Sequence, residues 1–326
     1  MIRRAGVIVV ALWALAAAAA PVLAPHRADE RFPRLLDAPP SRVTLAGGGV
    51  AIHPWRLVNQ LEQRYQLDEA AAIRLRWFAG GRLASSSDEA SAPLLLLGTD
   101  SYGRDVLSRL LFGARTSLAL ALVSALGAMA VGVAAGGVAG YAGGVLDDVL
   151  MRTCDLVMVL PATYVALAFR SVMPLVLPPA TVFALLASIF AIVGAPFIAR
   201  GVRAIVRAER GRDYAVAAEA LGASAARVLV RHLLPAARGY VAVQLTLLVP
   251  AFIVAEATLS YVGLGFPDPI ASWGTMLHDA SSNVRVFADF PWLLSPAAAM
   301  FLVVLGLNLA LEGSPEGLRY GLKSSQ

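Results

Sequence analysis

The sequence predicts an all-α membrane protein with six transmembrane helices and both termini in the cytoplasm. Of its 326 residues, 58% are hydrophobic and only 15% charged, which is too little charge to cover the surface of a soluble protein. Several apolar segments reach the roughly 20 residues that a bilayer-spanning helix needs. Arginines flank several of these segments, as expected where basic residues set membrane orientation.

Six segments have the length and apolar character of a membrane span. They are 5–24, 117–141, 149–169, 177–198, 240–263 and 291–311. A short proline-rich turn separates the third from the fourth, so these two predict a helical hairpin. Two long polar stretches remain, 25–112 and 199–239.

The distribution of arginines predicts the orientation of the spans. Arg3 and Arg4 precede the first span and place the N-terminus in the cytoplasm. The stretch 199–239 is rich in arginine and is predicted to be cytoplasmic, whereas 264–290 is poor in arginine and suits the outside. Six spans with both termini in the cytoplasm agree with the charge of all three segments: the N-terminus, 199–239 and 264–290. The segment 25–112 is then external, because long loops translocate largely regardless of their charge.

The first apolar segment has a second interpretation, as a signal peptide that is cleaved after Val22-Leu23-Ala24. Its apolar run exceeds the usual signal-peptide core of about 7–15 residues, which favours a retained anchor. The predicted organisation is an anchor over 1–24, an external segment over 25–112, a transmembrane domain over 113–312 that includes the cytoplasmic loop 199–239, and a cytoplasmic tail over 313–326.

Composition excludes several kinds of chemistry. Cys154 is the only cysteine, so an intrachain disulfide and a cysteine-cluster metal site are impossible. The histidines lack metal-ligand spacing, and we expect no metal site and no catalytic residue. Lys323 is the only lysine and follows Leu322, so the chain has no nucleotide-hydrolysing P-loop. The net charge of +5 is assigned to membrane orientation and lipid headgroups rather than to nucleic acid.

The second span carries glycines at strict four-residue spacing, which places them on one helix face. They are Gly132, Gly136, Gly140 and Gly144. Such a face lets another helix approach closely.

The stretch 212–235 predicts two short helices that meet at a glycine. Asp213 to Leu221 consists of good helix formers, and Gly222 stands where a C-terminal cap belongs. Ser224 is predicted to cap a second helix, which Pro235 ends. The small side chains of the first helix would form a surface that another protein can grip, although a plain connector on the membrane surface has the same features.

This stretch resembles the EAA loop of the membrane subunits of ABC importers. Five residues are in register with that pattern: Ala217, Ala218, Gly222, Leu234 and Pro235. Val216 replaces the expected glutamate, and His232 stands where isoleucine is common. The peptide-importing branch often has histidine there.

Further motifs resemble the permeases of the dipeptide, oligopeptide and nickel transport family. Before the second span the matching residues include Gly98, Thr99, Asp100, Gly103, Arg104 and Asp105. Glu256 to Gly265, followed by Ser272-Trp273-Gly274, resembles the end of the fifth span and its external loop, and Tyr141 to Gly144 resembles the turn after the second span. The resemblance covers about 97–320, whereas the external insert 25–96 matches nothing recognised.

The resemblance implies a C-type permease subunit in a bacterial inner membrane. It would form a heterodimer with a second homologous permease and provide a path for peptides or related small solutes. An external solute-binding protein would deliver the solute, and two cytoplasmic P-loop ATPase subunits would bind and hydrolyse ATP, so that this chain needs no cofactor. The implied ATPase-coupling residues are Asp213, Tyr214, Ala217, Ala218, Gly222, His232, Leu234 and Pro235. The alternatives are a non-transporting scaffold derived from a permease and a membrane-anchored enzyme with an external domain.

Three other features are open to two interpretations each. Glu256 is either a pore or gating carboxylate or a group bonded to a neighbouring helix. Asp100, Arg104 and Asp105 either brace an outer gate or form local ion pairs on a surface helix, which is the favoured interpretation. Trp273 is expected near the membrane interface, where it would be able to contact a docked binding protein.

Overall fold

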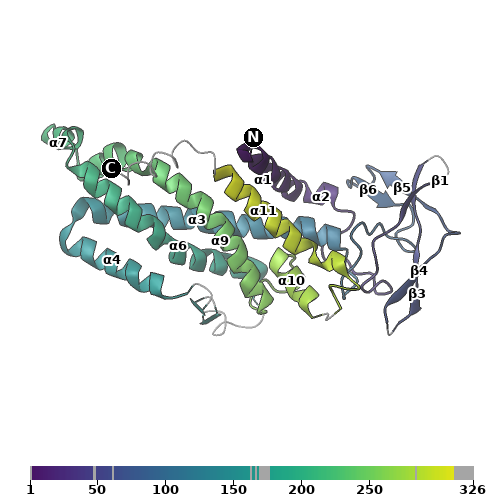
Figure 1. Cartoon of the computed structure of the whole chain (residues 1–326). Helices are drawn as coiled ribbons and strands as arrows, with labels where there is room; N and C mark the ends of the chain where they lie inside the picture. Colours follow the sequence, from purple (N-terminus) through teal and green to yellow (C-terminus); the bar gives the residue numbers. More distant parts are fainter. Residues whose placement is uncertain are drawn as a thin grey trace. The chain divides into compact units, whose positions relative to one another are not determined.

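The computed structural model describes residues 2–46, 49–60, 62–161, 164–165, 167–168, 177–282 and 285–311. The chain divides into two compact units. Unit 1 comprises Met1–Val7, Ala119–Ala255 and Leu305–Gln326, and unit 2 comprises Ile8–Leu118 and Glu256–Val304. The described residues are mostly helical, as predicted (Figure 1).

Among the described residues, four helical stretches are long and apolar enough to cross a membrane. They are α3 (Val106–Ala142), α6 (Pro179–Arg210), the stretch Ala225–Tyr261 that ends in α9 (Arg238–Tyr261), and the stretch Pro291–Ala310, which contains η3 (Pro291–Leu294) and most of α11 (Ser295–Leu311). These four coincide with the second, fourth, fifth and sixth predicted spans. Both α3 and α6 run well beyond the predicted limits.

The first and third predicted spans differ from the prediction. The segment 5–24 forms α1 (Ile2–Ala18) and the short α2 (Ala20–Leu23), with the break at Ala19. Pro21 has no backbone N–H to continue the helical hydrogen bonds across this break. Only α4 (Gly144–Val159) covers the third span, whose second half lies partly outside the described residues.

Glycines on α3 bring its backbone against α6 in unit 1. A Cβ atom on Gly132 would lie 2.6 Å from the carbonyl oxygen of Ala195, and one on Gly140 would lie 2.7 Å from that of Arg203. Gly136 faces the Ala199 backbone between these two positions. Gly144 lies outside α3: it begins α4 with φ +56°, and a Cβ there would meet open space.

The other helices of unit 1 pack on α6 through side chains. The rings of Phe190 and Phe252 stack with centroids 5.4 Å apart, and the Tyr240 hydroxyl donates to the Phe197 carbonyl at 2.7 Å, so α9 is held along α6. Asp147 joins α4 to α6 through an ion pair with Arg203.

Unit 2 contains strands, so the all-α prediction is too narrow. The strands are β1 (Val43–Ala46), β2 (Gly49–Ile52), β3 (Trp55–Asn59), β4 (Arg64–Leu67), β5 (Ile73–Trp77) and β6 (Ala84–Ser86). They form an antiparallel sheet of order β1-β2-β5-β6 and a separate hairpin β3-β4. Strands of three to five residues are too short to show a clear alternation of apolar and polar side chains.

The remaining helix of unit 2 is α10 (Trp273–Ser281). Ser272 caps it: the Ser272 hydroxyl accepts from the Thr275 N–H, and the Thr275 hydroxyl accepts in turn from the Ser272 N–H. This reciprocal cap fixes where α10 begins, and therefore where Trp273 and Asp279 lie.

Candidate functional site

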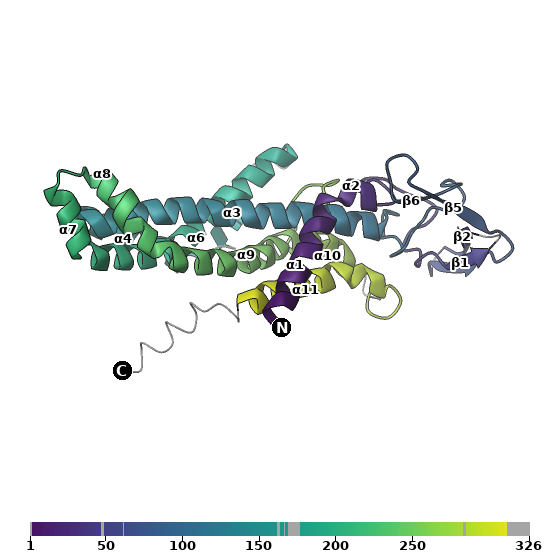
Figure 2. The ribbon, with the colours of Figure 1, turned by 90° about the horizontal axis from the view of Figure 1, so that it is seen from above.

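The predicted elbow is present in unit 1 as α7 (Asp213–Ala220) and α8 (Ala225–Arg227). Gly222 follows α7 with φ +83°, and its N–H donates to the Glu219 carbonyl at 2.9 Å. The Ala223 N–H donates to the Ala218 carbonyl at 3.0 Å, which completes a Schellman motif. Ser224 occupies the N-cap position of α8, but its side chain makes no capping hydrogen bond. Figure 2 shows α7 and α8 beside each other.

The helix after the elbow is irregular. Six residues form the π-helix η1 (Val228–Leu233), and the 3-10 helix η2 (Leu234–Ala237) follows before α9 begins. Pro235 has no N–H, so the regular bond to the residue four positions earlier cannot form. Val228 and Leu233 are buried and anchor this segment, whereas His232, Leu234 and Pro235 are partly buried.

The α7 surface combines small and apolar exposed side chains. Ala217 is exposed and Ala218 is partly buried, while Ala215 is buried against the protein. Tyr214, Val216 and Leu221 are 43%, 54% and 89% exposed. Contiguous apolar side chains on a surface are typical of a binding site for another protein.

Polar contacts tie α7, and Arg210 at the end of α6, to the end of α3. The Tyr141 hydroxyl donates to Glu219 Oε1 at 2.9 Å. The Arg210 guanidinium lies 4.7 Å from the centre of the Tyr141 ring and donates to the Tyr141 carbonyl. Sequence reasoning did not identify Glu219. The sequence did contain a signal for it. Val216 replaces the expected glutamate, and Glu219 follows Val216 by three residues, which is about one helical turn.

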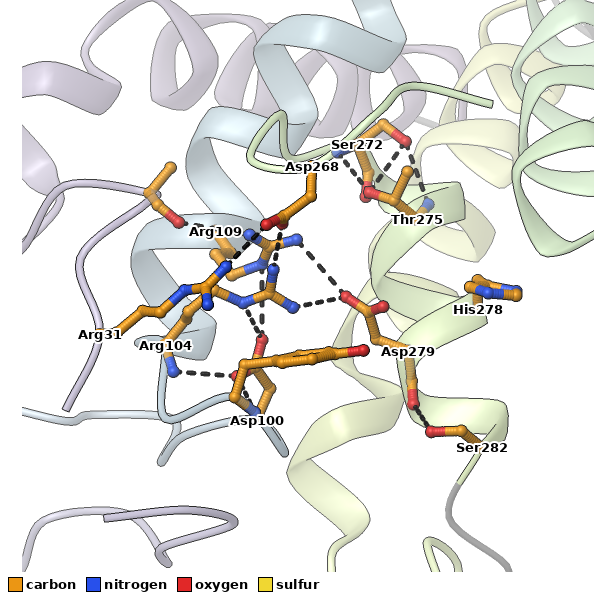
Figure 3. A network of polar contacts seen from close by, with 12 residues as sticks. Arg31, Asp100, Arg104, Arg109, Asp268, Ser272, Thr275, His278, Asp279 and Ser282 are labelled. Atoms are coloured by element: carbon orange, nitrogen blue, oxygen red, sulfur yellow. Dashed lines mark hydrogen bonds and ion pairs between the residues drawn. The ribbon is translucent and has the colours of Figure 1, made fainter. Parts of the chain in front are cut away.

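A buried arginine organises unit 2 before α3 (Figure 3). Arg104 is 2% exposed. Its Nε donates to Asp100 Oδ2 at 2.7 Å, its Nη1 to Asp268 Oδ1 at 2.7 Å, and its Nη2 to Asp279 Oδ2 at 2.6 Å. The three carboxylates come from three separate segments, so Arg104 joins the turn before α3 to the loop after α9 and to α10.

The predicted local ion pair forms between Asp100 and Arg104, but the prediction that it lies on the surface is wrong. The loop that contains Asp268 and the helix α10 cover the turn, and Asp100, Arg104 and Asp105 are all buried. Burial raises the pKa of the Asp279 carboxyl, which Arg104 and Arg109 oppose. Separation in sequence hid these partners, since Arg104 and Asp279 are 175 positions apart.

The other residues of this motif also have structural contacts. Asp105 accepts from the Ser108 hydroxyl at 2.5 Å and lies 3.3 Å from His26 Nδ1. The Thr99 hydroxyl accepts from the Ala38 N–H at 2.8 Å. Gly98 and Gly103 have φ values of +68° and +73°, conformations that favour glycine.

Glu256 is held by three hydroxyl groups within unit 2. It is 1% exposed and accepts from Ser117 at 3.0 Å and from Ser260 and Ser272 at 2.7 Å each. These contacts favour the interpretation of Glu256 as a group bonded to its neighbours over that of a pore-lining carboxylate.

Trp273 lies beside this carboxylate and is fully buried. Its Nε1–H donates to the Leu110 carbonyl at 3.1 Å, and its ring packs edge-on against Trp13 at 5.4 Å. The expectation that Trp273 would be able to contact a docked binding protein is wrong, because the surrounding helices cover the indole.

The chain is similar to known proteins over most of its membrane-spanning part. Residues 132–314 match the family described as "Binding-protein-dependent transport system inner membrane component". The oligopeptide transport system permease protein OppC of Bacillus subtilis is 35% identical over 222 residues, which cover 68% of this chain and 70% of OppC. The dipeptide transport system permease protein DppC of Alkalihalophilus pseudofirmus is 34% identical over 228 residues, which cover 70% of this chain and 72% of DppC. The glutathione transport system permease protein GsiD of Pectobacterium atrosepticum is 34% identical over 228 residues, which cover 70% of this chain and 73% of GsiD.

Proposed function

The chain belongs to the family of inner-membrane components of binding-protein-dependent transport systems, and from this membership we propose that it carries peptides or related small solutes. It is a permease subunit of such a transporter. The names of its relatives support the solute class, since they are permeases for oligopeptides, dipeptides and glutathione. All three solutes contain peptide bonds.

The proposed assembly contains this chain, a second homologous permease, two cytoplasmic ATPase subunits and an external solute-binding protein. The ATPases supply ATP binding and hydrolysis, because this chain has no P-loop. The geometry of α7 is the observation that carries the coupling role. This helix exposes Ala217 and the apolar side chain of Val216, and its C-cap residue Leu221 is exposed as well; the Schellman motif fixes where the helix ends.

The proposed mechanism passes ATPase motion from α7 to the spans. An ATPase that grips α7 moves a helix that Glu219 connects to Tyr141, at the end of α3. Because α3 packs on α6 through backbone-close glycines, movement of its end is transmitted along a rigid pair of helices. Transport then requires two arrangements of the helices, between which ATP binding by the partners selects.

The test is ATP-driven uptake of a labelled dipeptide into liposomes that contain the complete transporter. Ala217→Arg should abolish uptake and ATPase association without unfolding the permease, since Ala217 is exposed. Ala226→Arg, at an exposed position of α8, is the matched control and should retain both. Full uptake by Ala217→Arg contradicts the coupling role, and ATPase association without uptake by the unmodified complex favours the scaffold alternative.

A further inference from the structure

Unit 1 contains an open apolar groove of about 800 Å³. It lies between a face of α3 and the segment that runs from η1 into α9. Its walls include Met129, Val133 and Val138 from α3, Leu229 and Val230 from η1, and Leu245 from α9. The glycines that pack on α6 are not among these lining residues. The helix α3 therefore uses different residues to contact α6 and to line the groove.

The other residues that the structure describes leave the walls of this groove partly exposed. Val138 is 40% exposed and Val230 is 64% exposed. Both walls belong to helical stretches with the length and hydropathy of membrane spans. An apolar surface on membrane-spanning helices is covered by an apolar group, either a lipid chain or another protein.

Arg238 is the charged residue that lines this groove. Its Nε donates to the Pro235 carbonyl at 2.9 Å, which orients the guanidinium. Within the described part of the chain no carboxylate forms an ion pair with it, and the side chain is exposed. In the predicted orientation, Arg238 stands at the cytoplasmic end of α9. The inner leaflet carries the anionic lipids, and arginine binds phosphate oxygens well.

We propose that this groove binds an anionic phospholipid of the cytoplasmic leaflet, with one acyl chain along the apolar walls and the phosphate on Arg238. A lipid satisfies both the apolar walls and the unpaired cation. An apolar helix of a partner protein would fill the walls but would offer Arg238 no phosphate oxygen to bind. Since Leu234 and Pro235 also line the groove, the lipid contacts the segment that follows the elbow and stabilises it.

The test measures lipid binding by the purified full-length chain in its transporter complex. After delipidation, phosphatidylglycerol and phosphatidylcholine with identical acyl chains are titrated separately, and bound lipid is counted by native mass spectrometry. We expect tighter binding of phosphatidylglycerol. Arg238→Gln should weaken that lipid about fivefold, the effect of one arginine near an anionic surface, and weaken phosphatidylcholine less, because the choline cation offsets the charge of its phosphate. Arg227→Gln is the matched control, because Arg227 is an exposed arginine of the same segment that does not line the groove.

A second variant tests the apolar part of the site. Ala242 lines the groove and is exposed, so Ala242→Phe should fill the groove without disturbing the protein core and should reduce retention of both lipids. Unfolding temperature checks that the variant is folded. Three results would overturn the proposal: equal binding of the two lipids, equal effects of Arg238→Gln and Arg227→Gln, or crosslinking of Ala134→Cys to the second permease in a Cys154→Ala background.

Discussion

Arg104 balances the negative charge of three carboxylates, so the stability of unit 2 depends on the positive charge of this side chain. Replacing it by methionine leaves Asp100, Asp268 and Asp279 without their shared partner. Breaking a buried ion-pair network by removing one partner costs about 3–5 kcal/mol. We therefore expect Arg104→Met to lower the unfolding temperature strongly in detergent.

Arg31 provides the control for this prediction, because it binds Asp268 from a half-exposed position. Arg31→Met should cost about 1 kcal/mol or less, as exposed ion pairs do. Equal losses for the two variants would mean that burial of Arg104 carries no special weight.

Asp37 should make stability depend on pH. Its carboxyl is buried, its Oδ1 has no hydrogen-bond partner within the described chain, and burial and Asp100 raise its pKa from 3.8 to about 6 against the opposing charge of Arg285. Between about pH 4 and 6 the folded state keeps a proton that the unfolded state releases, so stability falls as pH rises through this window.

Asp37→Asn removes this ionisation and suits the backbone, since φ is +51° and asparagine tolerates that region. Above pH 7 the variant should be more stable than the parent by up to about 3 kcal/mol, and the two should converge below pH 4. Unfolding temperatures at pH 4, 6 and 8 test this. A difference that does not change with pH would assign the effect to a cause other than ionisation.

At the scale of elements, the α3–α6 contact depends on which face of α3 a side chain is added to. A Cβ on Gly136 would overlap the backbone of Ala199, which cannot rotate away. A Cβ on Gly137 would lie 3.2 Å from a Leu234 methyl group, which can move. Gly136→Ala should destabilise by about 1–3 kcal/mol through overpacking, whereas Gly137→Ala should be neutral or gain from helix propensity. Thermal unfolding of both variants tests this prediction. Equal stability of the two variants would argue against close packing of α3 on α6.

Elements that depend on local sequence could be predicted, and those that depend on distant partners could not. The apolar length of α3, α6 and α9 and the glycine at the end of α7 are local signals, and the structure contains these elements. The π-helix η1 has no such signal, because Pro235 alone predicts an ending and not a widened turn. The strands of unit 2 are too short for periodicity, and pairings such as Leu75 with Ser86 form across loops.

The candidate site divides in the same way. The EAA-like residues identified α7 as the candidate coupling element, but Tyr141 lies 78 positions from Glu219, and a hydrogen bond at that separation leaves no pattern in one sequence. Arg104 was noticed as part of a motif, yet its burial required the positions of Asp268 and Asp279. Trp273 was assigned to the interface from its type alone, whereas the helices around it decide its environment.

At the scale of the whole transporter, the Tyr141–Glu219 hydrogen bond is expected to set how efficiently ATP hydrolysis drives uptake. Tyr141→Phe removes this bond and leaves the Arg210 contact with the Tyr141 carbonyl available. A hydrogen bond to a carboxylate at an exposed site contributes about 0.5–1 kcal/mol, so solute uptake per ATP should fall about two- to fivefold while the ATPases stay bound. Thr153→Val is the matched control, because it also removes one exposed hydroxyl, which donates within α4 to the Val149 carbonyl. Uptake and ATP hydrolysis measured together in the same liposomes give the ratio. If Tyr141→Phe keeps the parental ratio, α7 must transmit its motion by packing alone. If both variants lower the ratio equally, the loss reflects general weakening of the permease.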